Sequence, residues 1–420
     1  LQALRRECSV DTNGVAQTWT GVWGEISEFS GTREQWDVLC VPTNSWQALS
    51  SDDEIMCDRN GRVLLLHVSS GRHRINLNCE NGFPPEFEDL HNLVGLRVDG
   101  ALRATKNVDL DIEKLTRRGV KNLQNIMELS LPNNDLVGNA IELCDFRGGY
   151  AFASRLNTLK LNNNKLTGLP PTSLSCAHYL RVLDISQNDL HGSLPDDWAD
   201  LIMLEELKFS GNSQIDGSLP TSWFPEVSDT PNSYYRLGNL KELDGSGCSL
   251  TGALPSNLGG MQKLETLSLF QNALDGLIPS SITRLTNLRE LKLGSNRFSG
   301  PLPADLFTDL TSSLREIDLS DNQLNGGLPS FPVTGFPVLK DLDVSKNLFE
   351  GTLPPFGAVN LFSLNVESNL FSGDFPSPCT STHLSHLGIQ GNAFTESLPD
   401  LSCLPELFYL DASRNSFTGA

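Results

Sequence analysis

Four residues near the carboxyl-terminal end have side chains of the types that bind zinc: Cys379, His383, His386 and Cys403. Thiolates and imidazoles brought together could form a four-ligand structural metal site. The two histidines, however, lie on either side of Leu384, which opens one copy of a repeated phrase described below. Because the repeat already accounts for their spacing, we predict that no metal binds here.

Sequence patterns of known catalytic sites are absent. The chain has no Gly-x4-Gly-Lys-Ser/Thr, no His-Glu-x-x-His, no Gly-x-Ser-x-Gly and no calcium-loop spacing. The acidic pairs Asp52-Asp53 and Asp196-Asp197 could take part in acid–base chemistry, but such pairs are common on solvated turns. We therefore predict that the protein is not an enzyme and has no cofactor.

A repeated phrase determines where most residues must lie. Leu-x-x-Leu-x-Leu-x-x-Asn-x-Leu-x-Gly-x-Leu-Pro recurs twelve times, with a period of about 24 residues that indicates a solenoid. One complete copy consists of Leu180, Leu183, Ile185, Asn188, Leu190, Gly192, Leu194 and Pro195. The copies begin at Ile126, Leu156, Leu180, Leu204, Leu240, Leu264, Leu288, Leu314, Leu339, Leu361, Leu384 and Leu407.

Each column of the phrase predicts a local structure. The alternation in Leu-x-Leu predicts a short, half-buried strand of a shared parallel sheet. The Asn column predicts a buried amide that satisfies backbone groups where the chain leaves the strand. Cys248 is the exception in that column, and we interpret it as a core residue without chemistry. The Gly and Leu-Pro columns predict turns and extended backbone.

An aromatic column accompanies the later copies. The residue two positions after Asn is mostly Phe from Phe298 onward, with Leu324 as the exception. Since one coil cannot bury its own apolar side chains, these rings are predicted to stack on those of neighbouring coils as a spine. The other members of this column are Phe349, Phe371, Phe394 and Phe417.

The segment Asn-x-Leu-x-Gly-x-Leu/Ile-Pro resembles the hallmark of the plant-type leucine-rich repeat family. This resemblance covers the chain from Ile126 onward and implies a right-handed solenoid. The implied architecture has a parallel β-sheet on the concave face, short helical, 3-10 and extended segments on the convex side, and an amino-terminal cap. Two degenerate copies are expected upstream, at Val63, Leu66 and Val68 and at Leu93, Leu96 and Val98.

We predict three regions from these features. Residues 1–62 form the cap, because this stretch is rich in tryptophan, lacks the phrase, and ends in Cys57-Asp58-Arg59-Asn60-Gly61-Arg62, which resembles the family's cap junction. Residues 63–125 hold the degenerate repeats and a basic insertion. Residues 126–420 hold the twelve repeats, of which the last is truncated and one carries an insertion at 205–239. Because an open end would expose the core, we expect the protein to continue beyond Ala420.

Composition excludes several kinds of partner. The 51 acidic residues outnumber the 31 basic residues, and the net charge of −20 disfavours nucleic acid and anionic membranes. No apolar run reaches the about 18 residues that a membrane span requires. The nine cysteines are compatible with an oxidising compartment, so we expect an extracellular or cell-surface location.

Cysteine positions predict two disulfides. Cys379 and Cys403 stand at similar places in consecutive coils, and Cys144 and Cys176 do so more loosely. Both pairs could connect neighbouring turns. The remaining four cysteines allow three connectivities in or near the cap, and the sequence does not choose among them. These four are Cys8, Cys40, Cys57 and Cys79.

Candidate partner-binding residues are aromatic. Most strand positions that face outward carry Glu, Asp, Lys, Ser or Thr, so Phe362 and Tyr409 stand out on the predicted concave face. The insertion at 205–239 adds four more rings, and insertions between repeats often form binding loops. An equally simple interpretation is that these rings pack on the solenoid itself. The four are Trp223, Phe224, Tyr234 and Tyr235.

Two functions are compatible with these features. The first is an extracellular recognition module that binds a protein or peptide, as the resemblance to plant-type receptor ectodomains and polygalacturonase-inhibiting proteins implies. The alternative is a structural building block of a cell-surface or extracellular assembly, which associates with itself or with a fixed partner. The aromatic-poor concave face and the absence of any Asn-x-Ser/Thr glycosylation sequon favour the alternative.

Overall fold

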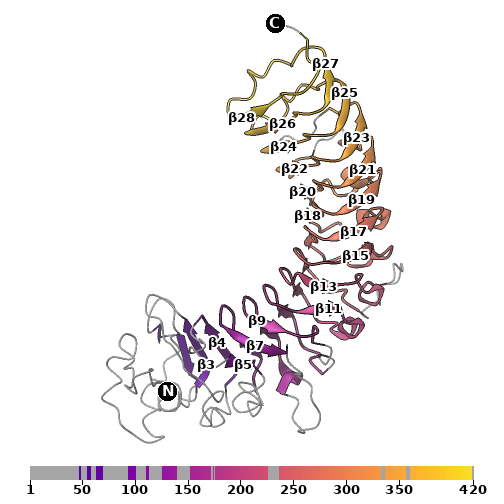
Figure 1. Ribbon diagram of the computed structural model, residues 1–420. Coiled ribbons are helices and arrows are strands. Elements are labelled where there is room, and N and C mark those ends of the chain that lie inside the picture. The colour runs from indigo at the N-terminus through magenta and orange to yellow at the C-terminus, as the bar shows by residue number, and fades with distance from the viewer. Residues whose placement is uncertain are drawn as a thin grey trace, which may run out of the picture. The chain divides into compact units, whose positions relative to one another are not determined.

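Short strands recur at the interval that the repeated phrase predicts (Figure 1). The computed structural model forms two units, Leu1–Leu204 and Glu205–Ala420. It describes the strands at 47–48, 54–57 and 63–69 and residues 93–100, 110–112, 125–139, 152–171, 174, 176–225, 236–332, 336–355 and 360–418.

Unit 1 contains a sheet that changes from antiparallel to parallel. β1 pairs with β2, and β2 with β3, in antiparallel fashion. From β3 onward the strands follow the repeats and pair in parallel, in the order β3, β4, β6, β8 and β10. The first two of these pairs have the register Leu66↔Leu96 and Leu96↔Leu129. The bounds are β1 (Gln47–Ala48), β2 (Glu54–Cys57), β3 (Val63–Ser69), β4 (Gly95–Asp99), β6 (Glu128–Ser130), β8 (Thr158–Lys160) and β10 (Val182–Asp184). The remaining elements are β5 (Leu110–Asp111), β7 (Leu136–Asn139), β9 (Lys165–Thr167), β11 (His191–Ser193), η6 (Phe152–Arg155) and η7 (Asp196–Asp200).

Unit 2 has a parallel sheet that we call the inner sheet, and in Figure 1 its strands lie on the concave side of this unit. Successive strands pair without a register shift, as in Leu207↔Leu243 and Leu243↔Leu267. The strands are β12 (Glu206–Lys208), β14 (Glu242–Asp244), β16 (Thr266–Ser268), β18 (Glu290–Lys292), β20 (Glu316–Asp318), β22 (Asp341–Asp343), β24 (Ser363–Asn365), β26 (His386–Gly388) and β28 (Tyr409–Asp411).

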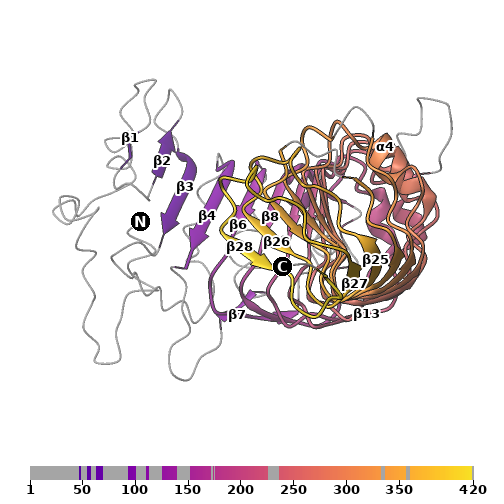
Figure 2. The same cartoon turned by 90° about the horizontal axis from the view of Figure 1, so that it is seen from above.

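A second parallel sheet and short helices form the other sides of unit 2. Seen from above, β25 and β27 lie on a different side of the stack from β26 and β28, and α4 lies apart from both (Figure 2). The second-sheet strands are β15 (Thr251–Ala253), β17 (Ala273–Gly276), β19 (Arg297–Gly300), β21 (Gln323–Gly326), β23 (Leu348–Gly351), β25 (Leu370–Asp374) and β27 (Ala393–Thr395), and β13 (Gln214–Asp216) precedes them outside this sheet. The helices are η8 (Thr221–Trp223), η9 (Leu258–Gly260), η10 (Ser280–Arg284) and α4 (Leu306–Asp309). This architecture confirms the predicted leucine-rich repeat solenoid.

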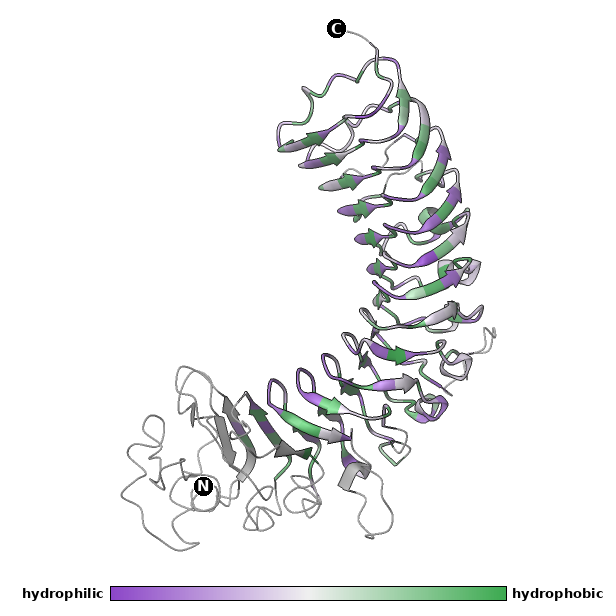
Figure 3. Cartoon of the chain, in the orientation of Figure 1, coloured by the Kyte–Doolittle hydropathy of each residue, from purple (hydrophilic) through white to green (hydrophobic). Residues whose placement is uncertain are grey.

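The core lies between these sides. In the inner-sheet strands the central residue is apolar and its neighbours are polar, so green and purple segments alternate along each coil (Figure 3). Leu243, Leu267 and Leu291 are fully buried, as the period of two requires for a strand with one buried face. The predicted spine also forms, because Phe349, Phe371 and the later rings stack with centroids 6.1–6.2 Å apart.

A ladder of asparagine side chains joins each coil to the one before it. In Asn296, Nδ2 donates to Leu293 O and Gly294 O within its own coil and to Leu269 O in the preceding coil, at 2.9–3.1 Å. Its Oδ1 accepts from Leu274 N at 3.0 Å. The same arrangement recurs at Asn164, Asn188, Asn272, Asn322, Asn347, Asn369, Asn392 and Asn415. Each amide thus satisfies backbone groups that would otherwise be buried without partners.

Cys248 replaces one amide in this ladder. Its Sγ lies 3.5 Å from Phe209 O and 3.8 Å from Ser246 O, so the thiol takes over donor contacts of the missing asparagine. A thiol sulfur is a much weaker acceptor than the amide Oδ1. The chain compensates with one extra residue between Asn212 and Ile215, which lets Ile215 N donate to Asn212 O at 3.0 Å. Cys248 is buried and free, as predicted.

The residue before each ladder asparagine has a left-handed backbone, which the sequence did not predict. Gln271 has φ 57°, Ser295 φ 52° and Lys346 φ 54°. Non-glycine residues adopt this region at a cost of about 1–2 kcal/mol. Backbone hydrogen bonds to the next coil offset that cost, because Gln271 N donates to Gly294 O and Ser295 N to Ser320 O.

Trp223 and Phe224 are core residues, so their assignment as partner-binding residues is wrong. Both have no exposed surface. Trp223 ends η8 and packs edge-to-face on Phe209 with a centroid distance of 6.4 Å, and Phe224 O accepts hydrogen bonds from Arg236 and Asn257. The missed signal is the position three residues after the repeat proline, which is apolar and buried in five consecutive coils. The five residues are Trp198, Trp223, Leu258, Ile282 and Leu306.

The predicted region boundaries at 62/63 and 125/126 stay a prediction. β1 and β2 lie within the proposed cap, but most of residues 1–62 and of the basic insertion lie outside the described residues. The same is true of Tyr234, Tyr235 and Cys144.

We expect Asn296→Ala to lower the free energy of unfolding by at least about 2 kcal/mol, because it removes hydrogen bonds from several buried backbone groups. The control is Asn287→Ala, which removes only an exposed bond to Gln262 O and should cost less than about 1 kcal/mol. Urea denaturation of both variants measures the difference. Equal midpoints would contradict a structural role for the ladder.

Cys248 should make stability fall in alkaline solution. Burial raises the pKa of its thiol from 9.0 to about 12, so above pH 9 the unfolded chain releases a proton that the folded chain retains. Stability therefore decreases as pH rises from 9 towards 12, by up to about 1.4 kcal/mol per pH unit. Urea denaturation of wild type and Cys248→Ala between pH 8 and pH 10.5 tests this: the wild type should have the steeper decline, and parallel curves would refute it.

Replacing Trp223 should damage the fold. We expect Trp223→Ala to destabilise unit 2 by about 3–5 kcal/mol, since it empties a fully buried indole site. Thermal unfolding followed by circular dichroism measures the effect. An unchanged melting temperature would mean that the ring is not part of the core.

Candidate partner-binding surface

Outward-facing side chains of the inner sheet line up in rows because the strands pair in register. One row contains the first residue of each strand, and another contains the third. The parallel pairs Asp341↔Ser363, Ser363↔His386 and His386↔Tyr409 define the carboxyl-terminal part of the first row. Neighbouring strands lie about 4.8 Å apart, so side chains along a row are close enough to interact.

Many charged side chains in these rows have partners on neighbouring strands. Lys208 Nζ lies 2.9 Å from Glu242 Oε1, and Lys292 Nζ lies 3.0 Å from Glu290 Oε2 and 3.2 Å from Glu316 Oε1. Burial opposes the charge on Lys292, but hydrogen bonds to the two glutamates outweigh it and raise its pKa. These groups neutralise one another, which explains how an acidic sheet remains stable.

The aspartates of the third row serve the turn that follows each strand. Asp318 Oδ1 accepts hydrogen bonds from the backbone N (2.9 Å) and Oγ (2.6 Å) of Ser320. Asp343 accepts from Ser345 N and from Asn365 Nδ2, at 2.9 and 3.1 Å. The same turn recurs at Asp184, Asp244 and Asp411. These carboxylates are part of the coil structure, so they are poor candidates for contacts with a partner.

Four aromatic side chains form an exposed group at the carboxyl-terminal end of the inner sheet, and we call it the aromatic patch: Phe362, His386, Phe408 and Tyr409. The centroid of the His386 ring lies 5.7 Å from that of Phe362 and 6.2 Å from those of Phe408 and Tyr409. Phe362 and Tyr409 are each 46% exposed, and Phe408 is 87% exposed. Large rings exposed together on a polar sheet are a feature of binding surfaces.

Asp341 lies in the same row as His386, two strands away. It is half-buried, and burial and the charge of Glu316 raise its pKa, against the influence of Lys340, His386 and Lys292. Among the described residues it has no side-chain hydrogen bond or ion pair. His386 Nδ1 is also buried without a hydrogen-bond partner in this part of the chain.

Two of the six predicted partner-binding residues, Phe362 and Tyr409, therefore lie together on an exposed surface. The structure adds His386 and Phe408 to them. The sequence already shows Phe408 as a ring beside Tyr409 and places His386 in the same repeat column as Tyr409, which the pairing of β26 with β28 confirms. The contacts among the four rings come from the structure.

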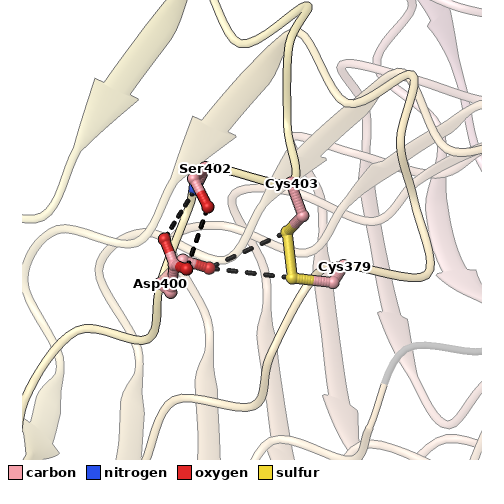
Figure 4. Close-up of a disulfide and its surroundings, with 4 residues drawn as sticks. All are labelled: Cys379, Asp400, Ser402 and Cys403. Atoms are coloured by element: carbon pink, nitrogen blue, oxygen red, sulfur yellow. Dashed lines mark hydrogen bonds between the residues drawn. A yellow bond between two sulfur atoms is a disulfide. The ribbon is translucent and has the colours of Figure 1, made fainter.

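Two cysteines near the carboxyl-terminal end connect consecutive coils. Cys379 and Cys403 form a disulfide with an S–S distance of 2.02 Å (Figure 4), which removes both sulfurs as zinc ligands. Asp400 lies beside the bridge, and hydrogen bonds from Ser402 lower its pKa. Cys176 is also disulfide-bonded. No cluster of three potential metal ligands occurs among the described residues, and no helix in this part of the chain is long and apolar enough to cross a membrane.

Comparisons with known sequences identify the repeats. Leucine rich repeat family models match residues 154–213, 238–298 and 313–333, and neither model describes an enzyme. Receptor-like protein 35 of Arabidopsis thaliana is 29% identical over 268 residues, which are 63% of this chain and 24% of that protein. Receptor-like protein EIX1 of Solanum lycopersicum is 31% identical over 136 residues, 31% of this chain and 12% of that protein. The chain thus spans about a quarter or less of these relatives.

Solved structures share the fold. The plant peptide hormone receptor RGFR1, in complex with RGF2, has a TM-score of 0.71 and 26% identity over 86% of this chain and 52% of that chain. A TDR receptor has a TM-score of 0.65 and 26% identity over 80% of this chain and 62% of its own. Together with the Asn-x-Leu-x-Gly-x-Leu-Pro repeat and the second sheet, this agreement shows that the chain is a leucine-rich repeat solenoid that is similar to plant receptor-like proteins.

Proposed function

We propose that this chain is the recognition part of an extracellular or cell-surface protein, and that it binds a protein or peptide without catalysing a reaction. The observation that carries the proposal is the aromatic patch. Exposed rings gain most from being covered by a partner, since each buries a large apolar area with little loss of side-chain entropy.

The rest of the inner sheet supports the same location for a partner. Its lysines and glutamates are paired with one another, and its third-row aspartates hold turns. These charged groups already have partners, so a ligand that formed new ion pairs with them would gain little binding free energy. Each exposed ion pair contributes only about 0–1 kcal/mol. A partner would therefore gain more at the aromatic patch than at other described parts of the inner sheet.

The similar structures give independent support. RGFR1, whose fold this chain shares, is a peptide hormone receptor and was solved in complex with RGF2. A protein of the same fold can thus serve as a peptide hormone receptor.

Self-association remains the second candidate. Leu348 and Leu370 are exposed on consecutive strands of the second sheet, β23 and β25. Exposed aliphatic side chains on neighbouring strands favour a contact between copies over this side. Sedimentation velocity separates the candidates: a monomer that binds peptides supports recognition, whereas concentration-dependent dimers that Leu370→Ser dissolves support assembly.

Selection from a random peptide library tests the recognition function. We expect peptides selected on the wild-type chain to bind Phe362→Ala and Tyr409→Ala with affinities lower by about 2 kcal/mol, or roughly 30-fold. The control is Leu277→Ala, which removes a side chain that is 59% exposed but lies outside the inner sheet. Biolayer interferometry measures affinity, and thermal unfolding verifies that all variants are folded. Peptides that bind all three variants equally would place recognition elsewhere and refute the proposal.

A further inference from the structure

The aromatic patch continues into a charged surface along the same row. From β22 to β28, the first strand residues are Asp341, Ser363, His386 and Tyr409. The residues just before them are Lys340, Phe362, Ser385 and Phe408. Apolar rings thus occupy the last coils, and charged side chains begin at β22.

Asp341 is the charged group on this surface that would gain most from a partner. Lys340 and Arg315 are exposed, so water solvates their charges at no cost. Asp341 is half-buried, where its carboxylate is poorly solvated, and Glu316 beside it has the same charge. Glu316 itself is paired with Lys292 at 3.2 Å. A cation beside Asp341 would compensate for the poor solvation of its carboxylate and for its repulsion by Glu316.

The small side chain of Ser363 lies between Asp341 and His386 in the row. Two strand spacings separate Asp341 from His386, or about 10 Å. An extended peptide advances about 3.3 Å per residue. A segment that crosses the strands could therefore place one side chain on Asp341 and another, two to four residues away, on the aromatic patch.

We propose that this row binds an extended peptide segment that places a basic side chain on Asp341 and an aliphatic or aromatic side chain on the aromatic patch. The inference rests on the proposed function, which it deepens by naming the chemistry of the ligand. The charge on Asp341 selects the basic residue and fixes the direction of the segment, while the rings supply most of the contact area.

A set of fluorescein-labelled octapeptides tests the proposal. One position is Arg, Gln or Glu, a second position two to four residues away is Phe or Ser, and the other positions are Gly, Ser or Asn. Fluorescence anisotropy should show that peptides with Arg and Phe bind the wild-type chain about tenfold more tightly than those with Gln and Phe. Peptides with Ser in place of Phe should bind more weakly still.

Variants of the chain identify the residues responsible. Asp341→Asn keeps the shape of the side chain and should abolish the preference for Arg over Gln, and Asp341→Lys should reverse it towards Glu. The matched control is Glu350→Gln, which removes the same charge from an exposed position on β23 of the second sheet and should leave the preference unchanged. Circular dichroism confirms that each variant is folded.

The two proposals fail in distinguishable ways. If peptides bind, and Phe362→Ala weakens them, but Arg, Gln and Glu peptides bind equally, the ligand chemistry proposed here is wrong while the recognition function stands. A preference for Glu that Asp341→Asn leaves intact would indicate an acidic ligand held by Arg315 and Lys340, and would also overturn this inference. If neither these peptides nor the selected library peptides depend on the aromatic patch, the proposed function itself fails.

Discussion

The hydrogen bonds of the asparagine ladder are the interaction on which the rest of this structure depends. Each strand is only three to five residues long in the repeats of unit 2, so most of every coil is not regular secondary structure. Backbone groups that turn inward at the end of a strand need partners in an apolar interior. Asn296 and its counterparts supply both a donor and an acceptor, and they connect each coil to the preceding one at the same point.

The consequence of the ladder is that inward positions are constrained and outward positions are not. Leucines and the phenylalanine spine keep the coils in register, as Leu207↔Leu243 illustrates. The outward residues of the inner sheet can then vary without a cost in packing. Most of them are charged residues that pair with each other, or aspartates that accept hydrogen bonds from the turn after the strand. The aromatic patch and Asp341 differ from these residues. The rings are exposed, and Asp341 has no ion pair among the described residues. A partner would therefore gain the most binding free energy by contacting these side chains.

Irregular positions in the ladder show how tightly its parts are coupled. Cys248 lacks the acceptor of an asparagine, and the amide that would use this acceptor, Ile215 N, finds another oxygen through one extra residue in the preceding coil. Two departures from the repeat, far apart in sequence, thus compensate each other. Trp223 provides a second example. Its place within an insertion suggested an exposed ring, but its distance from Pro220 puts it in the same buried column as Leu258 and Ile282.

The sequence by itself determined the repeat, the buried leucines and asparagines, the phenylalanine spine and the status of Cys248. All of these follow from periodicity, because residues one period apart meet in a solenoid. Only the tertiary structure decided how deeply the outward residues are buried and which of their side chains contact one another. His386 was a possible zinc ligand in the sequence, although the period already placed it beside Tyr409. The disulfide between Cys379 and Cys403 and the contacts of its ring with neighbouring rings made it the centre of an aromatic group. Likewise, the period places Glu316 beside Asp341, but the burial of Asp341 and the pairing of Glu316 with Lys292 depend on side-chain conformations that a spacing along the chain does not specify.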